Sequence, residues 1–277
     1  MKLGFAISAL NQPFMVQMKE GAEAEAKAQG ASLSVQDGND DASTQANQVQ
    51  NFTSQQVKGL IINPVDSDAA GPSVKAAANA KIPVIAADRS VNKAKVEATV
   101  ASDNVEGGKM AAKELADQLG GKGEILQIRG QVATSAARER NKGFTEGLKK
   151  FPGIKVVAKQ PADFLRAKGL DVTQNAMQAH PDIDGVFAEN DEMALGAIKA
   201  LGAKAGSDVK VVGFDGTPDA FKAVKKGTMN VTIAQQPSEL GKMAVRNAMR
   251  VIDGATIDSQ IKVPVKAVNK KNVDRFA

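Results

Sequence analysis

Two pairs of polar residues have the types and the spacing to bind a polar ligand. Asn63 and Asp88 each end an apolar run and lie 25 residues apart, and Asn190 and Asp215 repeat this pattern, offset by 127 residues. Arg89 follows Asp88 directly. A carboxylate beside a guanidinium offers acceptors and forked donors, which suits a vicinal diol. The alternatives are a surface ion pair or loop cap for Asp88 and Arg89, and a capped turn for Asp215.

Four further residues, together with Asn190, could also carry chemistry. Asn190 and Gln235 can each donate and accept, as a sugar hydroxyl requires, although a turn or cap role is the simpler interpretation for each alone. Arg140 lies near the start of a predicted helix, where the alternative is a solvated helix face. Phe14 and Phe164 stand in polar surroundings in a chain with no Trp or Tyr. A core role is the default for Phe, but a ring at a strand-to-helix junction can stack on a sugar face.

The elements that must position these residues alternate between strand and helix. Apolar runs of four to six residues bounded by polar residues predict strands buried on both faces. The carboxyl end of such a strand is where an open α/β sheet presents ligand-binding groups. Strand and helix patterns alternate through residues 3–101, and the same alternation begins again at residue 105. This alternation predicts two α/β lobes, each built on a parallel sheet.

The end of the chain carries more elements than the second lobe needs. A long helix at 237–252 and an extended segment at 260–265 follow the second series of alternating strands and helices. Returning them to the first lobe is an economical arrangement, and it requires several crossings between lobes. In the first half, the predicted helix at 66–80 is weakened by Gly71 and Pro72.

The composition describes a soluble globular chain and argues against several classes of protein. The 277 residues are enough for two lobes with ample cores, and 43% are hydrophobic. The net charge is +5, but the lysines are scattered and no basic tract is interleaved with aromatics, which gives a nucleic-acid role little support. No apolar run approaches the length of a membrane span. The chain opens directly on a strand pattern, so we expect either a cytoplasmic protein or one whose leader was removed.

Enzymatic and metal sites find little support in the sequence. The chain has one histidine, His180, and no cysteine, which makes a transition-metal site improbable. There is no Walker loop, no Gly-x-Gly-x-x-Gly opening a helix, and no evident Ser/His/Asp arrangement. Asp88 and Asp215 could form a glycosidase pair, but Arg89 would favour an ionised Asp88 rather than a proton donor. We therefore expect no enzyme activity, no cofactor and no metal.

Eight stretches of the sequence together resemble one family. They are Leu-Asn-Gln-Pro-Phe (10–14), Ile-Asn-Pro-Val-Asp-Ser-Asp-Ala (62–69), Ala-Ser-Asp-Asn (101–104), Thr-Ser-Ala-Ala-Arg-Glu-Arg (134–140), Gln-Pro-Ala-Asp-Phe (160–164), Ala-His-Pro-Asp (179–182), Asn-Asp-Glu-Met-Ala-Leu-Gly-Ala (190–197) and Val-Val-Gly-Phe-Asp-Gly-Thr-Pro-Asp (211–219). The chain resembles, over essentially its whole length, the periplasmic sugar-binding proteins of bacterial ATP-binding cassette importers, and it is most similar to their ribose-binding members.

This resemblance implies a fold and a way of binding. Two Rossmann-like lobes, 1–102 plus 236–263 and 103–235 plus 264–277, would be joined by three hinge crossings and close on a sugar in the cleft between them. The implied crossings fall near 102–104, 235–236 and 263–265. The resemblance implies that six residues form hydrogen bonds to the sugar hydroxyls, namely Asp88, Arg89, Arg140, Asn190, Asp215 and Gln235. It also implies that Phe14 and Phe164 stack on the sugar ring.

Two departures from the family's ribose motif fall in the amino-terminal lobe. Gln12 stands where the family has Asn, and Met15 stands where it has a second Phe. Gln is one methylene longer, and Met is not a flat platform. We include both residues in the predicted site, with D-ribose as the expected ligand and a different pentose or hexose as the alternative.

The resemblance also implies partners and a location. A monomer would deliver the sugar to the membrane permease of an importer, and a chemotaxis receptor is a second partner that the family allows. The expected location is periplasmic, or extracellular with a lipid anchor. The alternative from another class is the effector-binding core of a transcription factor of the lac repressor family, which shares this fold. A sugar-processing enzyme is a third class, without an identified catalytic group beyond the carboxylates.

Overall fold

The computed structural model describes residues 1–276 and divides the chain into two compact units. The first unit comprises Met1–Ser102, Ala133–Ala136 and Gln236–Pro264. The second comprises Asp103–Val132, Ala137–Gln235 and the residues from Val265 to the carboxyl end of the described chain. Ala277, the last residue of the expected second lobe, lies outside the described residues. Neither unit is a single continuous stretch of sequence.

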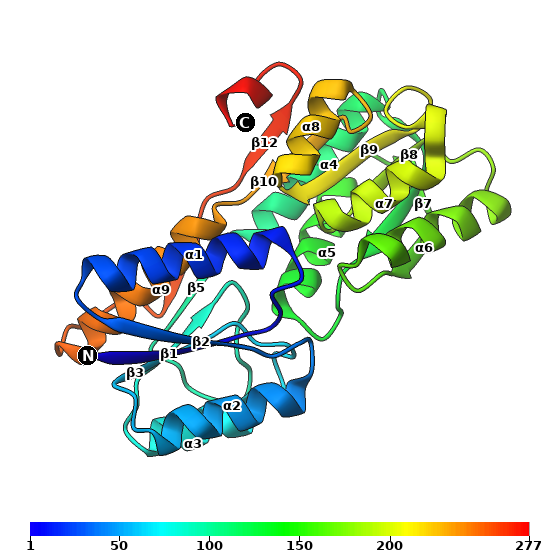
Figure 1. The fold of residues 1–277 in the computed structure, drawn as a ribbon. Coiled ribbons are helices and arrows are strands. Elements are labelled where there is room, and N and C mark those ends of the chain that lie inside the picture. The colour runs from blue at the N-terminus through cyan, green and yellow to red at the C-terminus, as the bar shows by residue number, and fades with distance from the viewer. Residues whose placement is uncertain (277) are drawn as a thin grey trace. The chain divides into compact units, whose positions relative to one another are not determined.

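The first unit is a six-stranded sheet with helices on both faces (Figure 1). The strand order is β11-β5-β4-β3-β1-β2, and every pairing is parallel. The strands are β1 (Lys2–Ile7), β2 (Ser32–Asp37), β3 (Gly59–Ile62), β4 (Val84–Ala87), β5 (Ala98–Ser102) and β11 (Gln260–Val263), and the helices are α1 (Pro13–Ala28), α2 (Ala42–Ser54), α3 (Gly71–Asn79) and α9 (Pro237–Ile252).

Alternating side chains of this sheet enter two separate apolar clusters. Ile85 and Ala87 of β4 pack with α1 and α9, whereas Val84 and Ala86 of the same strand pack with α2 and α3. The strand is therefore buried on both faces, as its uninterrupted apolar run predicts. Helix α9 packs along α1 and over β3, β4 and β5, which places this late segment in the first unit as expected.

The second unit repeats the architecture, with one edge strand reversed. Its sheet has the order β12-β10-β9-β8-β6-β7, and β12 runs antiparallel to β10 while the other pairings are parallel. Its elements are α4 (Asn104–Gln118), β6 (Lys122–Arg129), α5 (Ser135–Leu148), β7 (Gly153–Pro161), α6 (Arg166–Ala179), β8 (Gly185–Ala188), α7 (Asp191–Leu201), η1 (Gly202–Lys204), β9 (Lys210–Asp215), α8 (Pro218–Lys226), β10 (Val231–Ala234), β12 (Lys266–Asn269) and η2 (Val273–Arg275).

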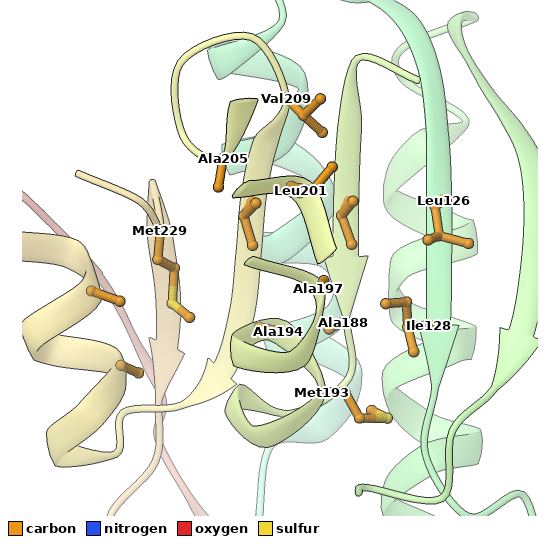
Figure 2. Close-up of a cluster of buried hydrophobic side chains, with 14 of the residues drawn as sticks. Leu126, Ile128, Ala188, Met193, Ala194, Ala197, Leu201, Ala205, Val209 and Met229 are labelled. Atoms are coloured by element: carbon orange, nitrogen blue, oxygen red, sulfur yellow. The ribbon is translucent and has the colours of Figure 1, made fainter. Parts of the chain in front are cut away.

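The core of the second unit also has two layers. One cluster joins β6 and β8 to α6, α7 and α8, and Figure 2 shows Leu126 and Ile128 of β6 beside Met193, Ala194 and Ala197 of α7. The other joins the opposite sheet face to α4 and α5, where Phe144 and Phe187 stack at 4.2 Å between ring centroids. The two parallel-sheet α/β units confirm the predicted fold class.

Two expectations about element boundaries were wrong. The segment at 66–80 is helical only from Gly71, because Asp66 Oδ1 accepts hydrogen bonds from the backbone N–H groups of Asp68 and Ala69, which forms a turn before Pro72 can begin the helix. The extended segment at 260–265 is the strand β11 only to Val263, and a second strand, β12, follows at Lys266. These two strands belong to different sheets.

Candidate functional site

The ten predicted site residues lie at or near the carboxyl edges of the two sheets, five in each unit. In the first unit, Gln12 precedes α1, Phe14 and Met15 lie in its first turn, and Asp88 and Arg89 follow β4 directly. All five are buried. The carboxyl ends of parallel strands form the ligand-binding edge of an open α/β sheet, so these side chains occupy the expected edge.

Asp88 and Arg89 form a buried pair in the first unit. The Arg89 Nε lies 3.6 Å from Asp88 Oδ2, and Arg89 Nη1 donates a hydrogen bond to the Pro64 carbonyl at 3.0 Å. Asp88 has a backbone φ of +64°, which an L-residue adopts at a cost of roughly 1–3 kcal/mol. Because both side chains are only 3% exposed, the surface ion pair considered from the sequence is excluded.

Asn63 organises this corner of the first unit, although it was not among the predicted ligand groups. Its Oδ1 accepts from the Ser8 N–H, and its Nδ2 donates to the Ala87 carbonyl and to Asp88 Oδ2. Asn63 thus ties together the ends of β1, β3 and β4. The signal in the sequence was its place at the end of an apolar run, 25 residues before Asp88.

The apolar candidates of the first unit are part of its core. Phe14 and Met15 both belong to the apolar cluster between the sheet and the pair α1 and α9. The Met15 sulfur accepts a long hydrogen bond from Ser8 Oγ at 4.0 Å. Gln12 occupies the N-cap position of α1 and is buried, and its side chain makes no cap hydrogen bond.

Arg140 makes several contacts within the second unit. Its Nη1 donates to the Glu189 carbonyl at 2.6 Å, and its Nε donates to Asn104 Oδ1 at 2.9 Å. Its guanidinium carbon lies 4.0 Å from the centroid of the Phe214 ring, a cation–π distance. Arg140 is buried, which excludes the solvated helix face considered from the sequence.

Asp215 lies between Arg140 and Gln235. Its Oδ1 accepts from Gln235 Nε2 at 2.7 Å and lies 3.6 Å from Arg140 Nη1. The Gln235 Oε1 is buried and has no hydrogen-bond partner among residues 1–276. A buried acceptor of this kind costs about 1–3 kcal/mol unless a donor reaches it, and a hydroxyl is a suitable donor. The arrangement therefore fits a polyhydroxylated ligand.

Asp191 holds the turn that carries Asp215. The backbone N–H groups of Gly216 and Thr217 both donate to Asp191 Oδ2 at 2.8 Å, and Thr232 Oγ1 donates to Oδ1 at 2.7 Å. Complete burial raises the pKa of this carboxyl to about 6, against the effect of these hydrogen bonds. Asp215 has a φ of +130°, a conformation in which L-residues are strained, and the clamp on the next two residues sustains it. Sequence reasoning missed Asp191, which resembles an ordinary acidic residue in the first turn of a helix.

Asn190 and Phe164 are joined to each other. Asn190 caps α7 by accepting from the Met193 N–H at 2.9 Å, which confirms the cap role considered from the sequence. Its Nδ2 donates to the Phe164 carbonyl at 3.2 Å. The Phe164 backbone has a φ of +64°, so its ring is held by an unusual turn between β7 and α6. A cap role does not use all of the hydrogen-bonding capacity of Asn190.

The chemistry of both sets of residues is recognition rather than catalysis. Each unit presents one buried Asp beside one buried Arg, together with an amide side chain and an aromatic ring. Within the described part of the chain, no group of three or more His, Cys, Asp or Glu side chains could hold a metal ion. No helix among residues 1–276 has the length and apolar character to cross a membrane.

Comparison with known proteins assigns the chain to a family. The family model described as a periplasmic binding protein domain matches residues 3–256. The ribose import binding protein RbsB of Salmonella typhimurium is 46% identical over 269 residues, covering 97% of this chain and 90% of the relative. The protein of the same name from Bacillus subtilis is 43% identical, covering 97% and 87%.

A solved structure extends the likeness to the fold. The periplasmic solute-binding protein of an ABC transporter from Actinobacillus succinogenes, with bound D-allose, has a TM-score of 0.93 and 31% identity, covering 99% of each chain. The family and these relatives are solute-binding proteins, which confirms the prediction that the chain is not an enzyme. The chain belongs to the periplasmic binding proteins, in the group that serves sugar import through ABC transporters.

Proposed function

We propose that this chain binds D-ribose and passes it unchanged to the membrane permease of an ABC importer. The relatives that share 43–46% of their residues with it are named as ribose import binding proteins. All six predicted hydrogen-bonding groups are buried. We propose that both sets contact the same sugar, so that removing a group from either unit lowers its affinity.

The observation that carries the proposal is the repeated pairing of a buried Asp with a buried Arg. Asp88 lies 3.6 Å from Arg89, and Asp215 lies 3.6 Å from Arg140. A carboxylate accepts hydrogen bonds from two neighbouring hydroxyls, while a guanidinium donates to their oxygens. Several such bonds at roughly 1.5–3 kcal/mol each are enough for a micromolar or tighter dissociation constant after the costs of ordering.

The choice of D-ribose rests on the names of the relatives, and it can be tested by comparing D-ribose with D-allose. D-Ribose and D-allose share the configuration of their pyranose ring at three carbons, and allose carries an additional hydroxymethyl group at C5. The Actinobacillus protein holds D-allose, whereas the sequence relatives are named for ribose. Gln12 and Met15, the two departures from the ribose motif, are the residues that we propose tune this choice.

Titration calorimetry against D-ribose, D-allose, D-xylose and L-arabinose tests the proposal. We expect the tightest binding for D-ribose, with a dissociation constant of about 1 μM or lower. Carbon NMR of the bound sugar over hours should show the same sugar at the end as at the start. A panel without any binding, or a sugar that is converted, contradicts the proposal.

The importer partner and the state of the protein are further parts of the proposal. We propose a periplasmic monomer, or a lipid-anchored extracellular one, that docks on the permease and is also available to a chemotaxis receptor. Expression in a bacterium that lacks its own ribose-binding protein should restore ribose uptake, and light scattering should give the monomer mass of 28.9 kDa. Sugar binding without restored uptake would favour the alternative, the effector-binding core of a repressor.

A further inference from the structure

Glu189 is a buried carboxylate directly behind the proposed sugar groups of the second unit. It lies between the end of β8 and Asn190, and it is fully buried. Its Oε2 accepts from the Gly130 N–H at 2.9 Å, its Oε1 accepts from Gln127 Nε2 at 3.2 Å, and the Arg129 Nε lies 3.5 Å from the same oxygen. This carboxylate, which follows β8, therefore binds the end of the neighbouring strand β6.

The contact with Gly130 leads to the Phe164 ring. A Cβ atom at position 130 would lie 2.0 Å from a ring carbon of Phe164, so the ring lies directly against the Gly130 backbone. The Phe164 carbonyl is in turn held by Asn190, the residue after Glu189. The position of Gly130 thus determines where the ring can lie, and the Glu189 side chain holds the Gly130 N–H.

Glu189 also contacts Arg140, through its backbone carbonyl. The Glu189 carbonyl accepts from Arg140 Nη1 at 2.6 Å, and the Glu189 N–H donates to the Ile128 carbonyl at 2.9 Å. Glu189 therefore contacts three parts of the site: Gly130, which lies against the Phe164 ring, the guanidinium of Arg140, and strand β6. Because Arg140 lies 3.6 Å from Asp215, a shift at Glu189 would reach that carboxylate as well.

The charges around Glu189 give it a second property. Arg129 from β6 and Arg140 from α5 lower its pKa, and Lys159 from β7 also lies within its field. Burial outweighs these cations and raises the pKa of Glu189 to about 7. The nearby carboxylates are otherwise engaged, since Asp191 clamps the turn after β9 and Asp215 pairs with Arg140.

We propose that Glu189 is a positioning residue of the sugar site: its ionised carboxylate holds Gly130 and the end of β6, and its protonation loosens this support of the Phe164 ring and lowers sugar affinity. The ionised carboxylate accepts hydrogen bonds from Gly130 and Gln127, and the Arg129 guanidinium forms an ion pair with it at 3.5 Å. A protonated carboxyl has to donate one hydrogen and faces two donors and a cation, so at least one of these contacts is lost or weakened. The effect on sugar affinity rests on the proposed function, because that function identifies the ligand. The contact between Glu189 and Gly130 does not depend on it.

Glu189→Gln tests the inference, since it keeps the shape and removes the charge. For the parent protein we expect D-ribose affinity to fall as the pH is lowered from 8 to 5.5. At pH 8 the variant should bind about tenfold more weakly, the lower end for a lost hydrogen bond to a charged group, and its profile should lose the step near pH 7 and keep only the part due to Asp191, whose pKa is about 6. Glu192→Gln is the matched control, because Glu192 pairs with Arg166 on the exposed side of α7 and should leave affinity and profile unchanged.

A measurement without sugar separates this inference from the proposed function. In protein labelled with ¹⁵N-glycine, the Gly130 amide resonance should shift with a midpoint near pH 7 in the parent and in Glu192→Gln, and the transition should be absent in Glu189→Gln. Equal titrations in the parent and in Glu189→Gln, or equal affinities at pH 8 and 5.5, overturn the inference. A parent that binds no sugar but shows this titration overturns the proposed function while the contact with Gly130 stands.

Discussion

The side-chain amide of Asn63 donates a hydrogen bond to the carboxylate of Asp88 at 3.1 Å, across the ends of β3 and β4. The corresponding pair in the second unit, Asn190 and Asp215, has the same separation in sequence, yet Asn190 contacts Phe164 and Met193. The support of Asp215 comes from Asp191 instead, through the two residues that follow it. The two copies of one sequence pattern therefore fix their carboxylates by different means.

We expect Asn63→Ala to lower both stability and sugar affinity. It leaves the buried Ser8 N–H without its partner, while the Ala87 carbonyl keeps the hydrogen bond from the Arg89 N–H, and the expected cost is roughly 1–3 kcal/mol in unfolding free energy. Denaturant unfolding and calorimetry measure the two effects. The exposed Asn51 of α2 is the control, and Asn51→Ala should stay within about 0.5 kcal/mol of the parent. An Asn63 variant with unchanged affinity would show that Asp88 keeps its position without this contact.

Asp215→Asn should weaken D-ribose binding by about tenfold to a few hundredfold, the equivalent of roughly 1.5–3 kcal/mol for a hydrogen bond to a charged group. The variant keeps an oxygen to accept from Gln235, but it loses the charge that Arg140 and the sugar hydroxyls share. Asp219→Asn is the matched control, because Asp219 is exposed and pairs with Arg166 and Lys222. Undiminished affinity in Asp215→Asn would remove Asp215 from the set of ligand groups.

Met15→Phe, combined with Gln12→Asn, should raise the preference for D-ribose over D-allose. Met15 is flexible and lies among apolar neighbours at the start of α1, whereas a phenyl ring in its place is rigid and larger. We expect the ring at position 15, and not the shorter side chain at position 12, to reduce the space and so to exclude the additional hydroxymethyl group of allose more strongly than it affects ribose. The ratio of the two dissociation constants decides the question, and an unchanged ratio would place the selectivity elsewhere.

The pH dependence of stability follows from Glu189 and Asp191. Burial raises the pKa of Glu189 from 4.5 to about 7 and that of Asp191 from 3.8 to about 6, so between these values the folded protein binds more protons than the unfolded chain. Their contribution to stability is therefore complete at low pH and is lost as the pH rises through about 6 to 7. Glu189→Gln should be more stable than the parent at pH 8 by roughly 1–3 kcal/mol, at about 1.4 kcal/mol per pKa unit less the mismatch of the new amide. Urea unfolding at pH 5 and pH 8 should show this difference shrinking at the lower pH, and a difference independent of pH would contradict the assignment.

Much of the fold followed from the sequence because buried parallel strands leave a direct signal. The apolar runs ending at Asn63, Asp88, Asn190 and Asp215 marked both the strands and their functional edges. The strand at 266–269 was missed because no turn residue other than Pro264 separates it from β11, and its pairing partner lies far away in sequence. The crossing near 263–265 was implied by the family resemblance, because local periodicity does not show that a chain passes from one sheet to another.

The supporting residues of the site were harder to predict than the proposed ligand groups. Asp191 and Glu189 stand beside Asn190 in sequence and look like ordinary acidic residues at the start of a helix. Their roles depend on burial and on backbone N–H groups contributed by Gly216, Thr217 and Gly130, which other strands bring to them. Only the tertiary structure brings these partners together.

The discontinuous first unit has a consequence for the order in which the protein becomes folded during its synthesis. Its sheet is complete only when β11 has been made, and the part of one face that α9 covers stays open until α9 follows about 135 residues after β5 (237 − 102). At roughly 5–20 residues per second, the first hundred residues wait about 7 to 27 seconds with this face of β3, β4 and β5 unprotected. The part of the chain that is synthesised first is therefore completed among the last, and throughout that interval its open apolar face is a binding surface for chaperones.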